Sequence, residues 1–478
     1  MITSDDPAGG PRPYSTRLRT ALVLTGTGTA GAYHAGILRA LYEAGVRVDL
    51  VAARGIGAVG AAFAAVDGAQ RLWDRDGFWK SDAIAGAYRW RLPLRITGWA
   101  LAAAVVLLAV PLIVSAAGVF AALLGLLLSL LTLTSASDAV TSGYRAAVES
   151  LLAPTALPTI IPRLVVFCLL VAVIVLVVTL GLSLWRAPAR RRARQGTFWR
   201  LFGSPVSSSF VLDRAAASLW SLIRGAAAIA PPSRVDLGRR YLELLTENLG
   251  QPGFRELLLV AHDMDARRDL LFALLGPAHR QRFFARDADG GRAAEAFDLA
   301  GVGRDHLMDA LAACLAIPVA TDPHLLRFPV EGPWRGEAHR VCDRPAALER
   351  LLDEVAAAGV EQVILVSPAP SPGRPHELSA ARADVRGRAA EQLASFETAA
   401  LRDAIDHVHA GGRFRGLYVI RPPHNPVGPL DFSGVYDERS DRHFSLGELV
   451  DRGYEDAYHQ FIEPVVAASG ERIVTVQS

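Results

Sequence analysis

The chain has 478 residues and a formal net charge of +2, and 51% of its residues are apolar while 21% are charged. This length suits one large domain or two to three ordinary ones, and it excludes a small disulfide-stapled scaffold. The apolar content excludes a disordered chain, and the small net charge does not suggest nucleic acid as a partner.

The N-terminal part predicts two strand–turn–helix units, each with a glycine-rich turn. Residues 1–19 form a tail that lacks the apolar core of a signal peptide. Ala21 to Thr25 is predicted as a buried strand, and three glycines follow it before apolar residues recur at helical spacing. Val46 to Ala53 is predicted as a second buried strand, followed by a turn at Arg54 to Gly57 and a helix of small residues.

Two apolar runs are long enough for the ~20 residues that cross a bilayer. Residues 96–137 carry no charge, and neither does the stretch from Leu164 to Trp185. As one helix, the first run would extend to ~60 Å at ~1.5 Å per residue. The sequence therefore leaves two interpretations open: the helix projects well beyond the membrane, or a segment near Pro111 and Gly118 is re-entrant or interfacial.

The predicted topology assumes that the sequence on both sides of these runs folds into one domain. Both flanks must then lie on the same side of the bilayer, so the number of crossings is even and residues 138–163 form a short external loop. Arginines precede the first run, and a second cluster follows the last run at Arg186, Arg190, Arg191, Arg192 and Arg194. The positive-inside rule places both termini and the soluble domain in the cytoplasm of a cell-membrane protein. We interpret the second cluster as a topogenic signal, or alternatively as a surface that captures anionic lipid.

The C-terminal half predicts alternating strands and helices, which is the pattern of an α/β fold. The expected strands are Leu257–Ala261, Gln362–Val366 and Gly416–Ile420, and the expected helices lie around 238–249, 303–316, 346–358 and 388–410. The cysteines at 168, 314 and 342 fit neither a disulfide framework nor a zinc site. His407 and His409 lie two residues apart, on different faces of a helix, so we expect no metal pair there.

The first glycine-rich turn matches G-x-G-x-x-G at Gly26, Gly28 and Gly31. In a dinucleotide-binding fold this spacing lets a pyrophosphate approach the start of the helix, and Asp49 at the end of the next strand would hold a ribose. A single such motif is weak, and here the second strand leads directly into another glycine-rich turn. A nucleotide-binding membrane protein therefore remains an alternative.

The segment from Leu24 to Leu41, Leu-Thr-Gly-Thr-Gly-Thr-Ala-Gly-Ala-Tyr-His-Ala-Gly-Ile-Leu-Arg-Ala-Leu, strongly resembles the opening of the patatin-like phospholipases. The turn Arg54-Gly-Ile-Gly-Ala-Val-Gly60 falls where that family has its G-x-S-x-G nucleophile elbow. Asp309 to Pro318 looks like the family's A-S-x-x-x-P segment, and Arg340 to Asp343 falls where the strand of its catalytic aspartate ends. The resemblance covers roughly residues 20–85 and 210–465.

The resemblance implies a serine–aspartate dyad in which backbone N–H groups of the glycine loop hold the oxyanion. In this chain the serine position is Gly57, Val59 replaces the second glycine of the elbow, and Asp343 is the candidate dyad acid. No nucleophile remains, so the catalytic site is not intact. The oxyanion loop is also altered, with Thr27 and Ala30 at two family positions; its residues are Gly26, Thr27, Gly28, Thr29, Ala30 and Gly31. A threonine of this loop or Cys314 is the alternative nucleophile.

We therefore expect a three-layer α/β/α patatin-like domain interrupted by a transmembrane helical insert. Its segments are a tail at 1–19, a first domain part at 20–95, the insert at 96–185, a basic juxtamembrane segment at 186–209 and a second domain part at 210–478. The expected function is that of an inactive lipid acyl hydrolase homologue that binds membrane lipids or a protein partner. The alternative is an active phospholipase or esterase with a non-standard nucleophile. We expect no cofactor, no metal and no nucleic acid partner.

Overall fold

The structure is a computed structural model that describes residues 14–151, 157–185, 203–288, 292–330, 334–370, 385–424, 427–437 and 442–466. It divides into two compact units. The α/β unit comprises Met1–Arg89 and Val206–Ser478, and the helical unit comprises Trp90–Pro205. The helical unit thus begins some residues before the run predicted at 96–185, and most of the segment predicted as juxtamembrane lies outside the described residues.

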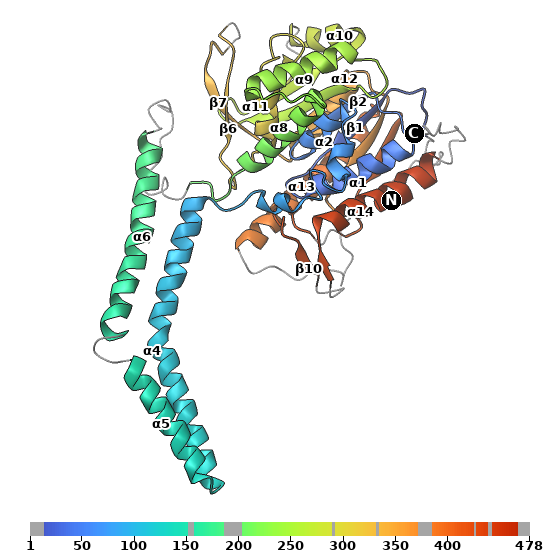
Figure 1. The fold of residues 1–478 in the computed structure, drawn as a ribbon. Helices are drawn as coiled ribbons and strands as arrows, with labels where there is room; N and C mark the ends of the chain where they lie inside the picture. The colour runs from blue at the N-terminus through green and yellow to red at the C-terminus, as the bar shows by residue number, and fades with distance from the viewer. Residues whose placement is uncertain are drawn as a thin grey trace. The chain divides into compact units, whose positions relative to one another are not determined.

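A nine-stranded sheet forms the centre of the α/β unit (Figure 1), with the strand order β5-β4-β3-β2-β1-β8-β9. β1 pairs in parallel with both β2 and β8, while β4 and β7 run antiparallel to β3. The strands of this sheet are β1 Thr20–Leu24, β2 Leu50–Ala53, β3 Glu256–Asp263, β4 Arg268–Leu274, β5 Glu295–Asp298, β6 His324–Arg327, β7 Ala338–Cys342, β8 Gln362–Val366 and β9 Gly416–Ile420. A separate hairpin consists of β10 Val435–Asp437 and β11 Arg442–Phe444.

Helices cover both faces of the sheet, because successive side chains of a strand point to opposite sides. Leu22 and Leu24 of β1 belong to a core with α1, α2, α8, α9, α11 and α14, whereas Ala21 and Val23 belong to a core with α10, α12 and α13. The helices of this unit are α1 Ala30–Glu43, α2 Gly57–Ala64, α3 Gln70–Trp73, η1 Asp82–Gly86, α8 Ser209–Arg224, α9 Arg234–Asn248, α10 Pro277–Ala288, α11 Leu307–Leu315, α12 Ala347–Ala357, α13 Val385–Gly411, α14 Leu446–Ala457 and η2 Tyr458–Val466.

The expected strands and helices of the α/β pattern are confirmed, with shifts at their ends. The second strand is shorter than predicted, since β2 begins at Leu50. Asp49 therefore precedes β2, where its carboxylate accepts a hydrogen bond from Thr20 N at 2.9 Å. The prediction that Asp49 ends this strand is wrong. Asp49 lies at the amino ends of β1 and β2, whereas the glycine-rich turns follow their carboxyl ends.

The helical unit consists of α4 Leu92–Leu130, α5 Thr134–Leu151 and α6 Leu157–Trp185. Helix α4 continues through Pro111, and Ser115 Oγ donates to the carbonyl oxygen of Pro111 at 3.0 Å. Its 39 residues span roughly 58 Å at ~1.5 Å per residue. The run is therefore one continuous helix, with no interruption near Pro111 or Gly118.

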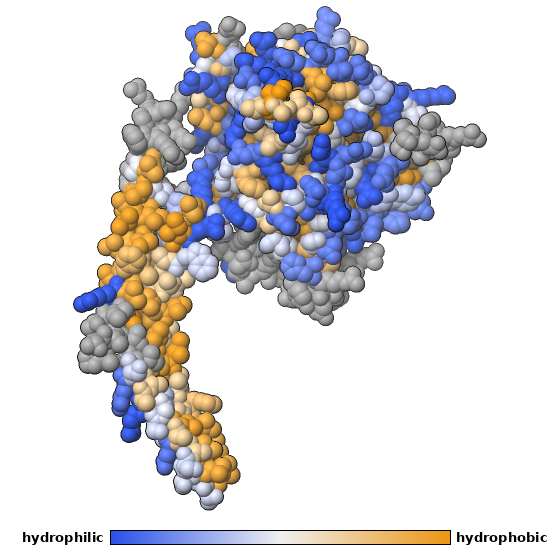
Figure 2. Space-filling model, in the orientation of Figure 1, coloured by the Kyte–Doolittle hydropathy of each residue, from blue (hydrophilic) through white to orange (hydrophobic). Residues whose placement is uncertain are grey.

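The segment predicted as a short external loop is mostly helix α5, which packs along the distal half of α4. Tyr144 Oη donates to Val114 O and Ser137 Oγ donates to Gly125 O, both at 2.8 Å. Among the described residues, α4 and the Ile161–Leu182 part of α6 are long and apolar enough, by length and composition, to cross a membrane. Apolar side chains dominate the exposed surface of these helices, as Figure 2 shows.

Candidate functional site

The turn between β2 and α2 has the geometry of a nucleophile elbow, a sharp strand-to-helix turn that presents one residue in a strained conformation. Arg54 follows the strand, Gly55 has φ +57°, and Gly57 is already the first residue of α2. A Cβ at residue 55 would lie 3.1 Å from Asp343 Oδ2, which is the partner expected for a dyad. The position that corresponds to a nucleophile is therefore Gly55.

Gly57, where the resemblance places the nucleophile, has no room for a side chain. A Cβ at Gly57 would lie 2.4 Å from the carbonyl oxygen of Leu24, in the backbone of the neighbouring strand. Glycine at this position lets α2 approach β1 closely. Neither Gly55 nor Gly57 supplies a nucleophilic side chain.

Arg54 fills the space next to the elbow. Its side chain has no exposed surface, and its guanidinium forms a two-point ion pair with Asp343, with Nη2 to Oδ2 at 2.6 Å and Nε to Oδ1 at 3.2 Å. A second two-point pair joins it to Glu397 of α13, with Nη1 to Oε2 at 2.6 Å and Nη2 to Oε1 at 3.0 Å. Both oxygens of the candidate dyad acid are therefore bound by a cation. We call Arg54, Asp343, Glu397 and Thr27 the buried ion cluster.

Thr27 of the glycine loop completes the cluster, since its hydroxyl donates to Glu397 Oε1 at 2.8 Å. Glu397 lies within the helix that the sequence predicts, but neither Glu397 nor Arg54 was expected at the site. The one signal in the sequence is a charge at the end of an apolar strand. A buried arginine needs carboxylate partners, although the sequence cannot say which ones.

The cluster contains one cationic group and two carboxylates. Burial raises the pKa of Asp343 to about 6; Arg54 opposes this rise and Glu397 adds to it. Burial disfavours the charge on Arg54, but Asp343 and Glu397 outweigh this effect and raise its pKa. The guanidinium thus stays charged, and the second carboxylate makes Asp343 easier to protonate.

The glycine loop presents a carbonyl, rather than an N–H group, to the elbow. Gly26 O accepts a hydrogen bond from Ile56 N at 3.0 Å, and a Cβ at Gly55 would approach this oxygen to 2.2 Å. In the strand-to-helix elbow of serine hydrolases, the N–H that follows the nucleophile is one of the oxyanion donors. Here that N–H is already bound, and a carbonyl dipole would repel a developing negative charge.

The rest of the loop is covered by the segment that contains Pro429. Thr29 N donates to Pro429 O at 3.0 Å, and a Cβ at Gly28 would lie 1.8 Å from the same oxygen. Ala30 and Gly31 begin α1, where a Cβ at Gly31 would lie 2.0 Å from the ring of Trp79. The loop residues are thus brought together, but as packing elements around the turn.

The alternative nucleophiles are all engaged or unreactive. The hydroxyls of Thr25 and Thr29 donate to the carbonyls of Val366 and Gly428, each at 2.9 Å. Cys314 is buried and donates to Val260 O, and burial raises the pKa of its thiol far above the usual range. Thiolate, the nucleophilic form, is therefore scarce at neutral pH.

The segment that resembles the A-S-x-x-x-P motif lies next to Asp343, the candidate dyad acid. Asp343 N donates to Ala316 O at 2.9 Å, and Tyr88 Oη donates to Leu315 O at the same distance. Asp343 follows β7 directly, and β7 pairs with β3. The structure therefore brings Asp343 to the glycine-rich turns from a point far along the chain.

The remaining predicted residues contribute nothing to this site. His407 binds Asp353 Oδ1 through Nε2 at 2.9 Å, and no group of three metal-ligating side chains occurs within the described parts of the chain. The arginines expected to face lipid lie outside the described residues: Arg186, Arg190, Arg191, Arg192 and Arg194.

The comparisons with known proteins do not assign the chain to a family. No protein-family model matches the chain, and no curated protein matches it. Among solved structures, the chain is similar to VipD from Legionella pneumophila at 12% identity and a TM-score of 0.28, over 93% of this chain and 67% of that one. A superposition at this score supports neither a shared fold nor a shared function. The chain is an α/β protein with a mostly parallel sheet and two helices that suit a membrane.

Proposed function

We propose that this protein is a membrane-anchored, patatin-like homologue of a lipid acyl hydrolase in which a buried ion cluster replaces catalysis and leaves a binding role. The observation that carries this proposal is the position of Arg54. Its guanidinium binds both oxygens of Asp343, next to a turn whose nucleophile position is Gly55. The sequence resemblance to patatin-like phospholipases supports the view that this arrangement derives from the catalytic site of a lipid acyl hydrolase.

Each requirement of an acyl hydrolase fails for a separate physical reason. A serine hydrolase needs a hydroxyl, a carboxylate free to accept its proton, and N–H donors for the oxyanion. Gly55 supplies no hydroxyl, Asp343 is paired with Arg54, and Ile56 N is bound to Gly26 O. Loss of the nucleophile alone costs on the order of 10⁶ in kcat, so no measurable turnover should remain.

The sheet supports an even number of membrane crossings. β1 and β2 precede the helical unit, β3 and β8 follow it, and they pair side by side in one sheet. One sheet cannot form from segments on opposite sides of a bilayer, so α4 and α6 would provide two crossings. The arginines that flank the first run at 89, 91 and 95 favour the cytoplasm for the α/β unit and both termini.

The remaining role is binding of membrane lipid, or of a protein partner. Anchored by two apolar helices, the α/β unit would remain near the bilayer surface, where lipid head groups are abundant. Nucleotide binding is the less favoured alternative, because Asp49 lies at the edge of the sheet opposite the glycine loop and Thr29 N is already bound.

A fluorophosphonate probe tests the loss of catalysis, with an active serine hydrolase as the positive control. We expect neither covalent labelling of the purified protein nor release of fatty acid from phospholipid or a short-chain ester. Thr27 is the residue to examine in any adduct, since its hydroxyl contacts the Glu397 carboxylate. Stoichiometric labelling mapped to Thr27 by mass spectrometry would support the active-hydrolase alternative and end the proposal of an inactive site.

A further inference from the structure

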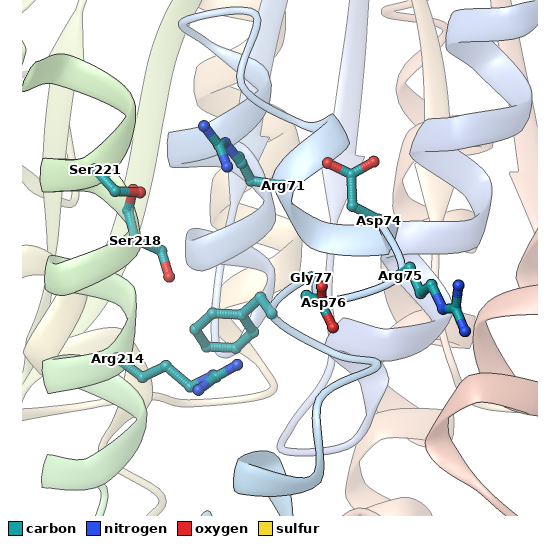
Figure 3. A pocket seen from close by; sticks show the side chains of 9 residues that line it. Arg71, Asp74, Arg75, Asp76, Gly77, Arg214, Ser218 and Ser221 are labelled. Carbon is teal, nitrogen blue, oxygen red and sulfur yellow. The ribbon is translucent and has the colours of Figure 1, made fainter. Parts of the chain in front are cut away.

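Outside the elbow, the described residues form a pocket and an apolar helix surface that have no role in the proposed function. The pocket, of about 420 Å³, lies between the loop after α3 and helix α8. Figure 3 shows that Arg71, Arg75 and Arg214 point in different directions there, so these cations do not converge on one ligand. The apolar surface lies on the distal half of α4, at residues 112–130, and its surroundings indicate what covers it.

Helix α5 covers only one side of this distal half. A Cβ at Gly118 would lie 2.4 Å from Tyr144 Oη, and a Cβ at Gly125 would lie 3.0 Å from Thr141 Cγ2. The two glycines are seven residues apart, so they lie on the same face of α4. Helix α5 therefore packs along the glycine face and leaves the other side of α4 uncovered.

The uncovered side is apolar throughout. Its large side chains recur at intervals of three or four residues, as one face of a helix requires, and they expose 56–73% of their surfaces. In Figure 2 the end of the helical unit is hydrophobic on the side of α4 and more hydrophilic on the side of α5. We call these side chains the exposed stripe: Val119, Phe120, Leu123, Leu126, Leu127 and Leu130.

The bilayer does not cover the exposed stripe if α4 crosses it as proposed above. At a tilt of ~40°, the upper end of the usual range, a hydrocarbon core of ~30 Å contains ~26 helical residues, so at least ~13 of the 39 residues of α4 lie beyond it. Arg91 and Arg95 favour the cytoplasmic surface for the start of the helix, so the surplus is at its distal end. Helix α5 also exposes Asp138, Arg145 and Glu149 beside this end, and charges at membrane depth are costly.

We propose that the exposed stripe is the interface between two copies of this chain, which pack as a parallel pair outside the membrane. The proposal rests on the two crossings proposed above, because they hold both copies in one orientation and bring both stripes to the same height. A two-fold interface joins the same patch of both subunits, and an uncharged apolar stripe is complementary to itself.

The size of the exposed stripe suits such a pair. Its six side chains expose on the order of 600 Å² per copy, so two copies can bury ~1,200 Å², the lower end of the range for stable interfaces. Anchoring in one bilayer raises the effective concentration of each copy for the other, so an interface of this size is sufficient.

Cysteine cross-linking of the full chain in native membranes tests the pair. A Cys168→Ala background removes the cysteine that is not fully buried. A parallel pair places each residue of the stripe near its own copy, so oxidation should link Leu123→Cys and Leu130→Cys into dimers. Ser142→Cys, on the exposed side of α5, is the matched control and should stay monomeric. Absence of cross-links at both stripe positions, or equal cross-linking of Ser142→Cys, overturns the proposal.

A charge on the stripe should separate the copies. Leu127→Glu in the Leu123→Cys chain should lower the cross-linked fraction at least tenfold, because it brings two like charges together in an apolar contact. Ala146→Glu adds the same charge to the exposed side of α5 and should have no effect. Since Leu127 is exposed in the single chain, its variant should still fold. An unchanged cross-linked fraction in Leu127→Glu refutes the interface.

Two other occupants of the stripe would be recognised in the same membranes. Quenching of a fluorophore on Leu130→Cys by lipids with spin-labelled acyl chains would show that the bilayer covers the stripe. A cross-linked product whose mass differs from two copies would show another protein. Either result refutes the proposal. Extraction with alkaline carbonate reports on the crossings separately: release refutes the crossings, whereas a retained protein without cross-links refutes only the pair.

Discussion

Arg54→Ala should destabilise the α/β unit strongly, because it leaves two buried carboxylates without their cation. Arg54 makes four hydrogen bonds of 2.6 to 3.2 Å to Asp343 and Glu397, and its side chain has no exposed surface. Removing one partner from a buried ion pair costs ~3–5 kcal/mol. For a unit of this size, that loss corresponds to a Tm lower by on the order of 5 °C.

The pH dependence follows from the sign of the pKa shift. Because the folded state raises the pKa of Asp343 to about 6, it holds this proton more tightly than the unfolded chain does. The contribution of Asp343 to stability is therefore greatest at low pH and declines as the pH rises from about 4 to about 6. In Arg54→Ala the lowering effect of the guanidinium is gone, so the decline extends to higher pH. The loss of stability should be larger at pH 8 than at pH 5.

Thermal and urea unfolding of the full chain in a neutral detergent, followed by near-UV circular dichroism, measures this effect. Arg47→Ala is the matched control, because Arg47 pairs with Asp49 but has 63% of its side chain exposed. Exposed pairs contribute ~0–1 kcal/mol, so this variant should melt almost like the parent protein. An Arg54→Ala variant as stable as Arg47→Ala, or one whose loss is equal at pH 5 and pH 8, would refute the interpretation of the cluster.

Four further predictions concern the elbow and the membrane. Gly57→Ser should lower the Tm in a thermal melt, because the new Cβ would lie 2.4 Å from a backbone carbonyl oxygen. Gly55→Ser should show no hydrolysis of a short-chain ester, because Gly26 O still faces the turn and Asp343 is still paired with Arg54; restored turnover would contradict this prediction. Ser142→Cys, on the exposed side of α5, should react with an impermeant maleimide in intact cells while a C-terminal tag stays protected from external protease; the reverse pattern would contradict the proposed topology. Alkaline carbonate should leave the protein in the membrane fraction, since apolar burial in α4 and α6 is insensitive to charge screening, whereas release would indicate surface attachment.

Local sequence patterns were enough to predict the framework of the fold. The short apolar runs at 257–261, 362–366 and 416–420 are strands, and the uncharged runs are long helices, because hydrophobic periodicity and length act within one segment. The glycine-rich turns were also placed correctly between a strand and a helix. Strand β7 was indicated only by the family resemblance, and β4 was missed although Leu270–Leu274 is an apolar run. The short strands β5 and β6 were missed because their formation depends on pairing with neighbours that a local pattern does not include.

The tertiary structure decided the register of the elbow. From the sequence, Gly55 and Gly57 are equivalent glycines in one turn, and the family pattern placed the nucleophile at the second. The backbone separates them, because only Gly55 has a positive φ and faces Asp343, whereas Gly57 packs against Leu24. The position of Asp49 likewise depended on where β2 begins, which is set by pairing with β1.

The chemistry of the site also depended on contacts between distant segments. Arg54 lies 289 residues from Asp343 and 343 residues from Glu397 in the chain. The sequence by itself determined that a nucleophilic side chain is missing from the turn and that an arginine ends an apolar strand. Only folding determined that this arginine neutralises the candidate base, because pairing of β3 with both β2 and β7, together with the packing of α13, assembles the three charged groups where water is excluded.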